Sequence, residues 1–222
     1  MKVHTGIPGF DELTNGGFTK GSINLLVGGP ATGKTTFCLQ YLWNGLKSGE
    51  PGIYIAFEQE IDAVRAFAMD FGWDFSIYEN SGLMQFLHFS PFGFSDTHQM
   101  MLEMILKSKA ERLVFDSISI YGLFLENSFE FRKDVVDLSL ALKKKKDSTV
   151  IFSGETLEQK KKQKISRFDV EEFIADSIIK LSFESLGGQF PRSIQVRKMR
   201  RTLHDMGVHP LEITNEGLVV HF

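Results

Sequence analysis

The sequence has little of what secreted and membrane proteins need. It contains one cysteine, Cys38, so no disulfide can form within the chain. No stretch reaches the roughly 18 consecutive apolar residues of a membrane-spanning helix, and residues 1–10 have no apolar core of signal-peptide length. The net charge of -3 gives no overall attraction to nucleic acid or to an anionic membrane. These absences predict a soluble cytoplasmic protein in which Cys38 is a small buried side chain.

The composition also lacks any sign of a domain boundary. No internal repeat and no low-complexity linker interrupts the 222 residues, so we expect one domain over 1–222. Hydrophobic residues make up 42% and charged residues 24%, which is an ordinary globular balance. The 21 phenylalanines are a heavy aromatic load that we expect to lie mainly in the core.

Apolar runs alternate with helical patterns through the first two thirds of the chain. The patterns predict strands over 23–27, 53–57, 85–89, 112–117 and 149–154, and helices over 34–47, 61–71, 95–109 and 129–146. This alternation predicts an α/β fold with a mainly parallel twisted sheet, helices on both faces and a ligand site at the carboxyl ends of the strands. In helix 95–109 the inner face is expected to be Met100, Met101, Met104 and Ile105.

The last third of the chain changes character. Its β-like runs are joined by turns and have no long helices between them; they cover residues 177–183, 192–199, 210–214 and 217–221. They predict antiparallel strands that extend one edge of the sheet. A short helix between two turns is expected within residues 1–20.

A phosphate-binding motif follows the first predicted strand of the sheet. Its sequence is Gly28-Gly29-Pro30-Ala31-Thr32-Gly33-Lys34-Thr35-Thr36. In such a P-loop, backbone N–H groups at a helix N-terminus point at an anion and the lysine reaches the outer phosphates. Gly28 and Gly33 let the backbone approach phosphate without a Cβ in the way, and the Thr35 hydroxyl would coordinate Mg²⁺. The strand before the motif and the helix after it favour nucleotide binding over a chance match.

Two carboxylates at strand ends are candidates for the chemistry. Asp116 ends a short apolar run and is expected to hold Mg²⁺ and its water ligands, although buried strands also end in Asp for turn reasons. Ser117 cannot act as a general base. Glu58 is therefore expected to lie beside the P-loop and to hold the attacking water in line with the γ-phosphate. The alternative role for Glu58 is a favourable negative charge at a helix start.

The order of these motifs resembles the KaiC-like group of the RecA superfamily nearly from end to end. The similar segments are 5–13, the P-loop, 57–59, 71–73, 115–117, 170–176 and 196–200. The resemblance implies a RecA-like P-loop NTPase core, assembled as a homo-oligomeric ring that is commonly a hexamer, with ATP bound between subunits. It also implies that Lys198 and Arg200 reach the γ-phosphate of the neighbouring subunit and that His204 lies near the ribose. Without the family resemblance, residues 197–201 would indicate only a basic strand at the edge of the sheet.

The chain departs from the family pattern at two places. The family typically carries two adjacent glutamates at the catalytic strand end, and here the second is Gln59, which is expected to lower the hydrolysis rate without abolishing it. Glu172 and Phe173 stand where the self-phosphorylating copy of KaiC has a Ser-Thr pair. The chain therefore resembles the ATPase-type copy, and neither self-phosphorylation at that site nor a clock role follows.

The sequence leaves three functions open. The leading hypothesis is an Mg²⁺-dependent ATPase that acts at subunit interfaces and drives a regulatory conformational change. A DNA-dependent recombination or repair ATPase is the second, based on the lysine-rich segment 158–164, where a pore-facing loop is implied by the resemblance. Nucleic acid is not the favoured partner, because such a loop is usually solvated and no aromatic residue lies among these lysines. The third is a nucleotide-gated regulator with little turnover, for which Gln59 is the only hint.

Overall fold

The computed structural model describes residues 1–89, 97–123, 128–156, 170–183 and 190–222. Within this part of the chain, nine strands form one sheet in the order β11-β10-β9-β8-β3-β7-β6-β4-β5. The strands are β3 (Ile23–Gly28), β4 (Gly52–Ala56), β5 (Met84–His88), β6 (Arg112–Asp116), β7 (Thr149–Glu155), β8 (Ser177–Ser182), β9 (Arg192–Met199), β10 (Val208–Thr214) and β11 (Gly217–Val220).

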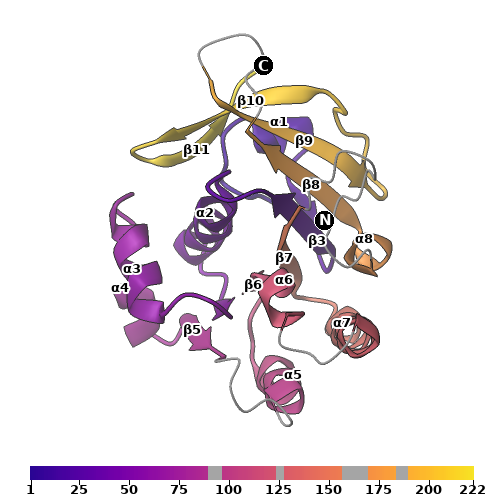
Figure 1. The fold of residues 1–222 in the computed structure, drawn as a ribbon. Coiled ribbons are helices and arrows are strands. Elements are labelled where there is room, and N and C mark those ends of the chain that lie inside the picture. Colours follow the sequence, from indigo (N-terminus) through magenta and orange to yellow (C-terminus); the bar gives the residue numbers. More distant parts are fainter. Residues whose placement is uncertain (90–96, 124–127, 157–169, 184–189) are drawn as a thin grey trace.

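Helices cover both faces of the sheet (Figure 1). One face carries α2 (Lys34–Lys47), α3 (Ile61–Met69) and α4 (Ser76–Asn80). The other face carries α5 (Thr97–Lys107), α6 (Ile118–Tyr121), α7 (Ser128–Lys144) and α8 (Val170–Ile174). Two buried hydrophobic clusters lie on the two sides of the sheet, and the central strand β3 is buried along its whole length because both of its faces are covered.

The pairing confirms the predicted mainly parallel sheet and corrects one strand. β3, β4, β5, β6, β7 and β8 run parallel to their neighbours within this set, whereas β9, β10 and β11 are antiparallel. The prediction that residues 177–183 begin the antiparallel edge was wrong, since β8 pairs parallel with β3. The antiparallel part starts one strand later, at β9.

Other local expectations are met to different degrees. The short N-terminal helix is α1 (Phe10–Leu13), and it lies beside a two-stranded sheet of β1 (Lys2–Val3) and β2 (Phe18–Thr19) that the sequence patterns did not predict. Cys38 is free and fully buried as predicted, and burial raises the pKa of its thiol. Among the described residues, no helix combines the length and the apolar character needed to cross a membrane.

The predicted inner face of α5 was half wrong. Met101 and Ile105 are buried, but Met100 is 57% exposed and Met104 is 39% exposed. Residues four apart share a helix face, so the pairs 101/105 and 100/104 are rotated from each other by about 100°. Only Met101 and Ile105 can therefore pack into the core beneath the helix.

A buried arginine ties α2 to the sheet. Arg112 on β6 is 2% exposed, donates from Nε to Glu50 Oε2 at 2.5 Å and donates from Nη1 to the Tyr41 carbonyl oxygen at 2.6 Å. Its guanidinium lies over the Tyr41 ring, 4.6 Å from the centroid. A buried cation is tolerated only with such partners. Gly45 on α2 leaves the space that the arginine side chain occupies.

Gly45→Ala should destabilise the fold. In a solvent-exposed helix the same change would stabilise the helix by about 1 kcal/mol. The new Cβ would lie 2.2 Å from Nε and 2.3 Å from Cδ of Arg112. We expect the free energy of unfolding in urea to fall by about 1–3 kcal/mol. In an Arg112→Ala background the same change should cost nothing more. An equal loss in both backgrounds would contradict the steric explanation.

Candidate functional site

The P-loop connects the central strand β3 to α2. Gly33 precedes the helix with φ of 106°, a left-handed conformation that favours glycine, and Ala31 also has a positive φ of 56°. The Thr32 hydroxyl donates to the Gly29 carbonyl oxygen at 2.9 Å and closes the turn. A Cβ on Gly28 would lie only 2.8 Å from the Leu181 carbonyl oxygen, so the neighbouring strand β8 requires glycine there.

The lysine of the motif lies inside this loop. Lys34 Nζ donates to the carbonyl oxygens of Gly28 at 3.0 Å and Gly29 at 2.8 Å. Burial lowers the pKa of Lys34, and nearby carboxylates, chiefly those of Asp116 and Glu155, act in the opposite direction. The ammonium group is thus held next to the N-terminus of α2, where an anion would be bound.

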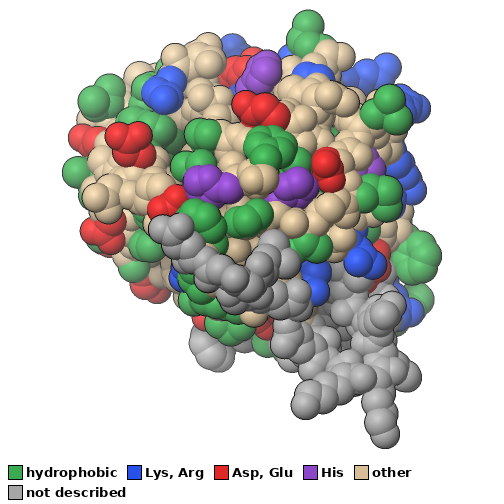
Figure 2. Space-filling view, turned by 90° about the horizontal axis from the view of Figure 1, so that it is seen from above, with side chains coloured by type: hydrophobic (Ala, Val, Ile, Leu, Met, Phe, Trp, Pro, Cys, Tyr) green, Lys and Arg blue, Asp and Glu red, His purple; other side chains and the backbone are tan. Residues whose placement is uncertain are grey.

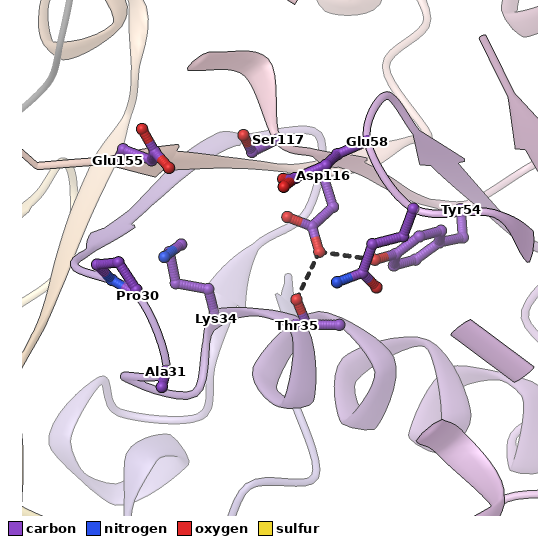
Figure 3. A pocket seen from close by; sticks show the side chains of 10 residues that line it. Pro30, Ala31, Lys34, Thr35, Tyr54, Glu58, Asp116, Ser117 and Glu155 are labelled. Atoms are coloured by element: carbon purple, nitrogen blue, oxygen red, sulfur yellow. Dashed lines mark hydrogen bonds between the residues drawn. The ribbon is translucent and has the colours of Figure 1, made fainter. Parts of the chain in front are cut away.

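Three hydroxyl groups converge on the Asp116 carboxylate at the end of β6. Thr35 Oγ1 donates to Oδ2 at 2.9 Å, and Tyr54 Oη donates to the same oxygen at 2.6 Å (Figure 3). Ser153 Oγ donates to the other oxygen, Oδ1. These groups come from α2, β4 and β7, so the carboxylate joins three elements of the fold.

A cavity of about 310 Å³ lies between the P-loop and the strand ends. The side chains in Figure 3 surround it, and its lining residues are Pro30, Ala31, Lys34, Thr35, Tyr54, Glu58, Gln59, Asp116, Ser117 and Glu155. Glu58 lies just beyond the end of β4, which is separated from β3 by β7 and β6. The sequence reasoning missed Glu155, although its position at the end of a predicted parallel strand was a usable signal.

A second, larger cavity of about 720 Å³ adjoins the first. The two share Ala31, Lys34, Thr35 and Gln59. The other lining residues are Gly33, Thr36, Glu60, Ala63, Phe67, Arg192 and Ile213. The site therefore consists of a small polar cavity at the start of α2 and a wider one with apolar walls.

The polar cavity suits a hard divalent cation. Thr35 and Asp116 present oxygen atoms, which Mg²⁺ prefers, and they lie within hydrogen-bond distance of each other. Among the described residues, no group of three or more His, Cys, Asp or Glu side chains is arranged to hold a metal. A Mg²⁺ ion here would take most of its other ligands from water and from phosphate, as is usual for this ion.

Lys198 and Arg200 lie near the amino ends of the parallel strands, whereas the P-loop lies at their carboxyl ends. Because β9 is antiparallel to β8, Lys198 pairs with Ile178 near the amino end of β8, whereas Leu181 pairs with Gly28. Lys198 Nζ donates to the carbonyl oxygens of Glu172 at 2.9 Å and Ala175 at 2.7 Å. Arg200 Nη1 contacts Asp176 Oδ1 at 3.3 Å.

His204 also lies away from both cavities, in the connection between β9 and β10. Its Nδ1 lies 3.2 Å from the Thr202 carbonyl oxygen, and Nε2 is buried without a partner in the described part of the chain. Figure 2 views the molecule from the side of β10 and shows several histidines beside acidic side chains on this face. Elsewhere in this part of the chain, His209 contacts Asp205 at 3.2 Å and His221 contacts Glu212 at 2.9 Å. The lysine-rich segment 158–164 falls outside the described residues.

Comparisons with known proteins agree on one family. The family model described as "ATPase: KaiC" matches residues 3–222. A UPF0273 protein of Pyrococcus horikoshii is 33% identical over 99% of this chain and 94% of its own length. The circadian clock protein KaiC3 of Synechocystis is also 33% identical, and this chain covers 45% of it. The crystal structure of a KaiC-like protein from Pyrococcus horikoshii matches with a TM-score of 0.88 and 36% identity, over 100% of this chain and 99% of that one.

The two first glycines of the loop should respond differently to substitution. Gly28→Ala would place a Cβ 2.5 Å from Thr32 Oγ1, and we expect it to lower the stability of the ligand-free protein by about 1–3 kcal/mol. Gly29→Ala is the matched control, because the nearest atom to its Cβ is Thr32 Cγ2 at 3.9 Å. Denaturant unfolding of both variants measures the difference. Equal stabilities would contradict the geometry of the loop.

Proposed function

The chain belongs to the KaiC-like ATPase family of the RecA superfamily, and on this basis we propose that it hydrolyses ATP slowly, with Mg²⁺, at the interfaces of a homo-oligomeric ring. The hexamer is the proposed ring size. The observation that carries the proposal is the polar cavity, where the P-loop lysine, the Thr35–Asp116 pair and Glu58 line one space. The cycle would change the shape of the ring or its affinity for a partner.

The two adjoining cavities fit the two parts of a nucleotide. The triphosphate would lie in the smaller cavity, where the N–H groups at the start of α2 and the Lys34 ammonium attract anions. The nucleoside would lie in the larger cavity, whose apolar residues Phe67 and Ile213 suit a base. This arrangement supports the proposed contacts of residues 28–36 with the phosphates.

Thr35 and Asp116 are the proposed holders of Mg²⁺. When bound, the ion would neutralise charge on the phosphate oxygens. The chain's own part is to keep the Thr35 hydroxyl and the Asp116 carboxylate together at 2.9 Å. Lys34 would bind the outer phosphates by exchanging its present carbonyl partners for phosphate oxygens.

Hydrolysis needs a base for the attacking water, and the cavity offers two glutamates. We assign this role to Glu58, which lies beyond the end of β4 on the side of the cavity that holds Asp116 (Figure 3). Glu155 ends β7 and lies on the side of the cavity that holds Lys34 and Pro30 (Figure 3). We therefore take Glu155 as the less suited of the two to activate water.

The position of Lys198 and Arg200 supports assembly as a ring. They lie near the amino ends of the parallel strands and cannot reach the P-loop of their own chain, which follows the carboxyl end of β3. In a head-to-tail ring these amino ends would face the cavity of the next subunit. There the two cations would stabilise charge that develops on the transferred phosphoryl group. His204, which follows on the same side, is the proposed contact to the neighbour's ribose.

Glu58→Gln should retain ATP affinity and lose about 10²-fold or more in the rate of phosphate release, because the amide cannot accept the proton of water. Glu155→Gln is the matched control in the same cavity and should keep most of the activity. Phosphate release at saturating Mg²⁺-ATP and equilibrium ATP binding measure the two effects. Parental turnover in Glu58→Gln together with slow turnover in Glu155→Gln would transfer the role to Glu155. A parent protein that binds ATP but releases no phosphate would indicate a nucleotide-gated regulator.

Lys198→Ala and Arg200→Ala should each be rescued in mixed rings. Each variant keeps an intact P-loop, while Lys34→Ala subunits keep both Lys198 and Arg200. Some interfaces in a mixed ring therefore combine an intact P-loop from one subunit with intact Lys198 and Arg200 from its neighbour. An equal mixture of Lys34→Ala with either variant should recover about a quarter of the parent activity if subunits mix randomly around the ring. Native mass spectrometry shows whether the rings are mixed. Mixed rings without any recovery would contradict action between subunits.

A further inference from the structure

Tyr54 contacts the proposed Mg²⁺ site although it belongs to neither the P-loop nor the strand that ends in Asp116. It lies on β4 and is 1% exposed. Its hydroxyl is 2.6 Å from Asp116 Oδ2, the oxygen that also accepts from Thr35 (Figure 3). The hydroxyl therefore touches the carboxylate from the side of β4, opposite the contact that Ser153 makes through Oδ1.

The Tyr54 ring is buried, and its hydroxyl faces the Asp116 carboxylate. Alternation along β4 places Tyr54 and Ala56 on the face covered by α2, and the ring packs against Phe86 with centroids 5.7 Å apart. A buried phenol needs a hydrogen-bond partner, and the Asp116 carboxylate supplies it. Because a carboxylate oxygen accepts hydrogen bonds, the Tyr54 hydroxyl is the donor in this contact.

The hydroxyl groups together set the plane of the carboxylate. Tyr54 and Thr35 hold one oxygen, and Ser153 holds the other. Removing the Tyr54 hydroxyl would leave Oδ2 with the Thr35 bond alone, and Thr35 is itself a proposed metal ligand. Groups that orient the ligands of a metal typically contribute about 10–100-fold to its affinity.

We propose that Tyr54 is a positioning residue for Mg²⁺: its hydroxyl orients the Asp116 carboxylate toward Thr35 and so sets the Mg²⁺ concentration at which nucleotide is held tightly. This inference rests on the proposed function, since it assumes that Mg²⁺-ATP occupies the polar cavity. It also links the metal to the water-activating side, because Tyr54 and Glu58 belong to the same segment of chain.

Tyr54→Phe tests the proposal with the least disturbance, because it removes one oxygen and keeps the ring. Tyr41→Phe is the matched control: Tyr41 is also fully buried, and its hydroxyl donates to the Thr149 carbonyl oxygen at 3.1 Å, away from Asp116. The affinity for a fluorescent ATP analogue is measured in EDTA and across a Mg²⁺ titration. Mn²⁺ bound with ATP is counted separately by electron paramagnetic resonance, a readout that does not depend on turnover.

The expected result separates the metal from the nucleotide. In EDTA, Tyr54→Phe should bind the analogue like the parent, whereas its half-saturating Mg²⁺ and Mn²⁺ concentrations should rise about tenfold. Tyr41→Phe should match the parent in both. If Tyr54→Phe has the parent's half-saturating metal concentrations, or already loses nucleotide affinity in EDTA, the proposed role of Tyr54 is wrong. Neither result would contradict the proposed function. A parent protein that binds no ATP, or whose binding ignores Mg²⁺, would refute the proposed function and this inference with it.

Discussion

The hydrogen bond between Thr35 and Asp116 is the contact on which the site depends. It joins the first turn of the P-loop helix to the end of β6, two strands away from β3. A partly buried carboxylate is stabilised by hydrogen-bond donors, and here hydroxyl groups from α2, β4 and β7 provide them. The same interactions that satisfy this charge therefore fix the relative positions of the elements that line the polar cavity.

The strand directions distribute the functional groups between the two ends of the parallel strands. The carboxyl ends lie on one side, which brings together Glu58, Asp116 and Glu155 around the P-loop. The reversal of direction at β9 sends Lys198 to the other side. One chain thus presents an acidic cavity at the carboxyl ends of the parallel strands and cations at their amino ends, which is the arrangement that the proposed head-to-tail ring would need.

The site residues that could be proposed from the sequence are those marked by local patterns. The P-loop has a fixed spacing, and strand ends are visible as changes from apolar to charged residues, so Lys34, Asp116 and Glu58 could be proposed together. Tyr54 and Ser153 lie inside apolar runs and resemble core residues. Their contacts with Asp116 follow from strand order and from the pairing of Ala56 with Asp116, which no local pattern contains. The direction of β8 was missed for the same reason, since it depends on how the chain returns to the sheet.

The charges of the polar cavity bear on the proposal that nucleotide is bound between subunits. In the described part of the chain its lining carries three carboxylates, Glu58, Asp116 and Glu155, against the single ammonium group of Lys34. Backbone N–H groups at the start of α2 offset only part of this excess when a triphosphate enters. A glutamate in place of Gln59, which borders both cavities, would add further repulsion. Under the proposed function the neutral side chain would avoid this repulsion, and the remaining excess is the electrostatic reason to propose Mg²⁺ and the cations of a neighbouring subunit.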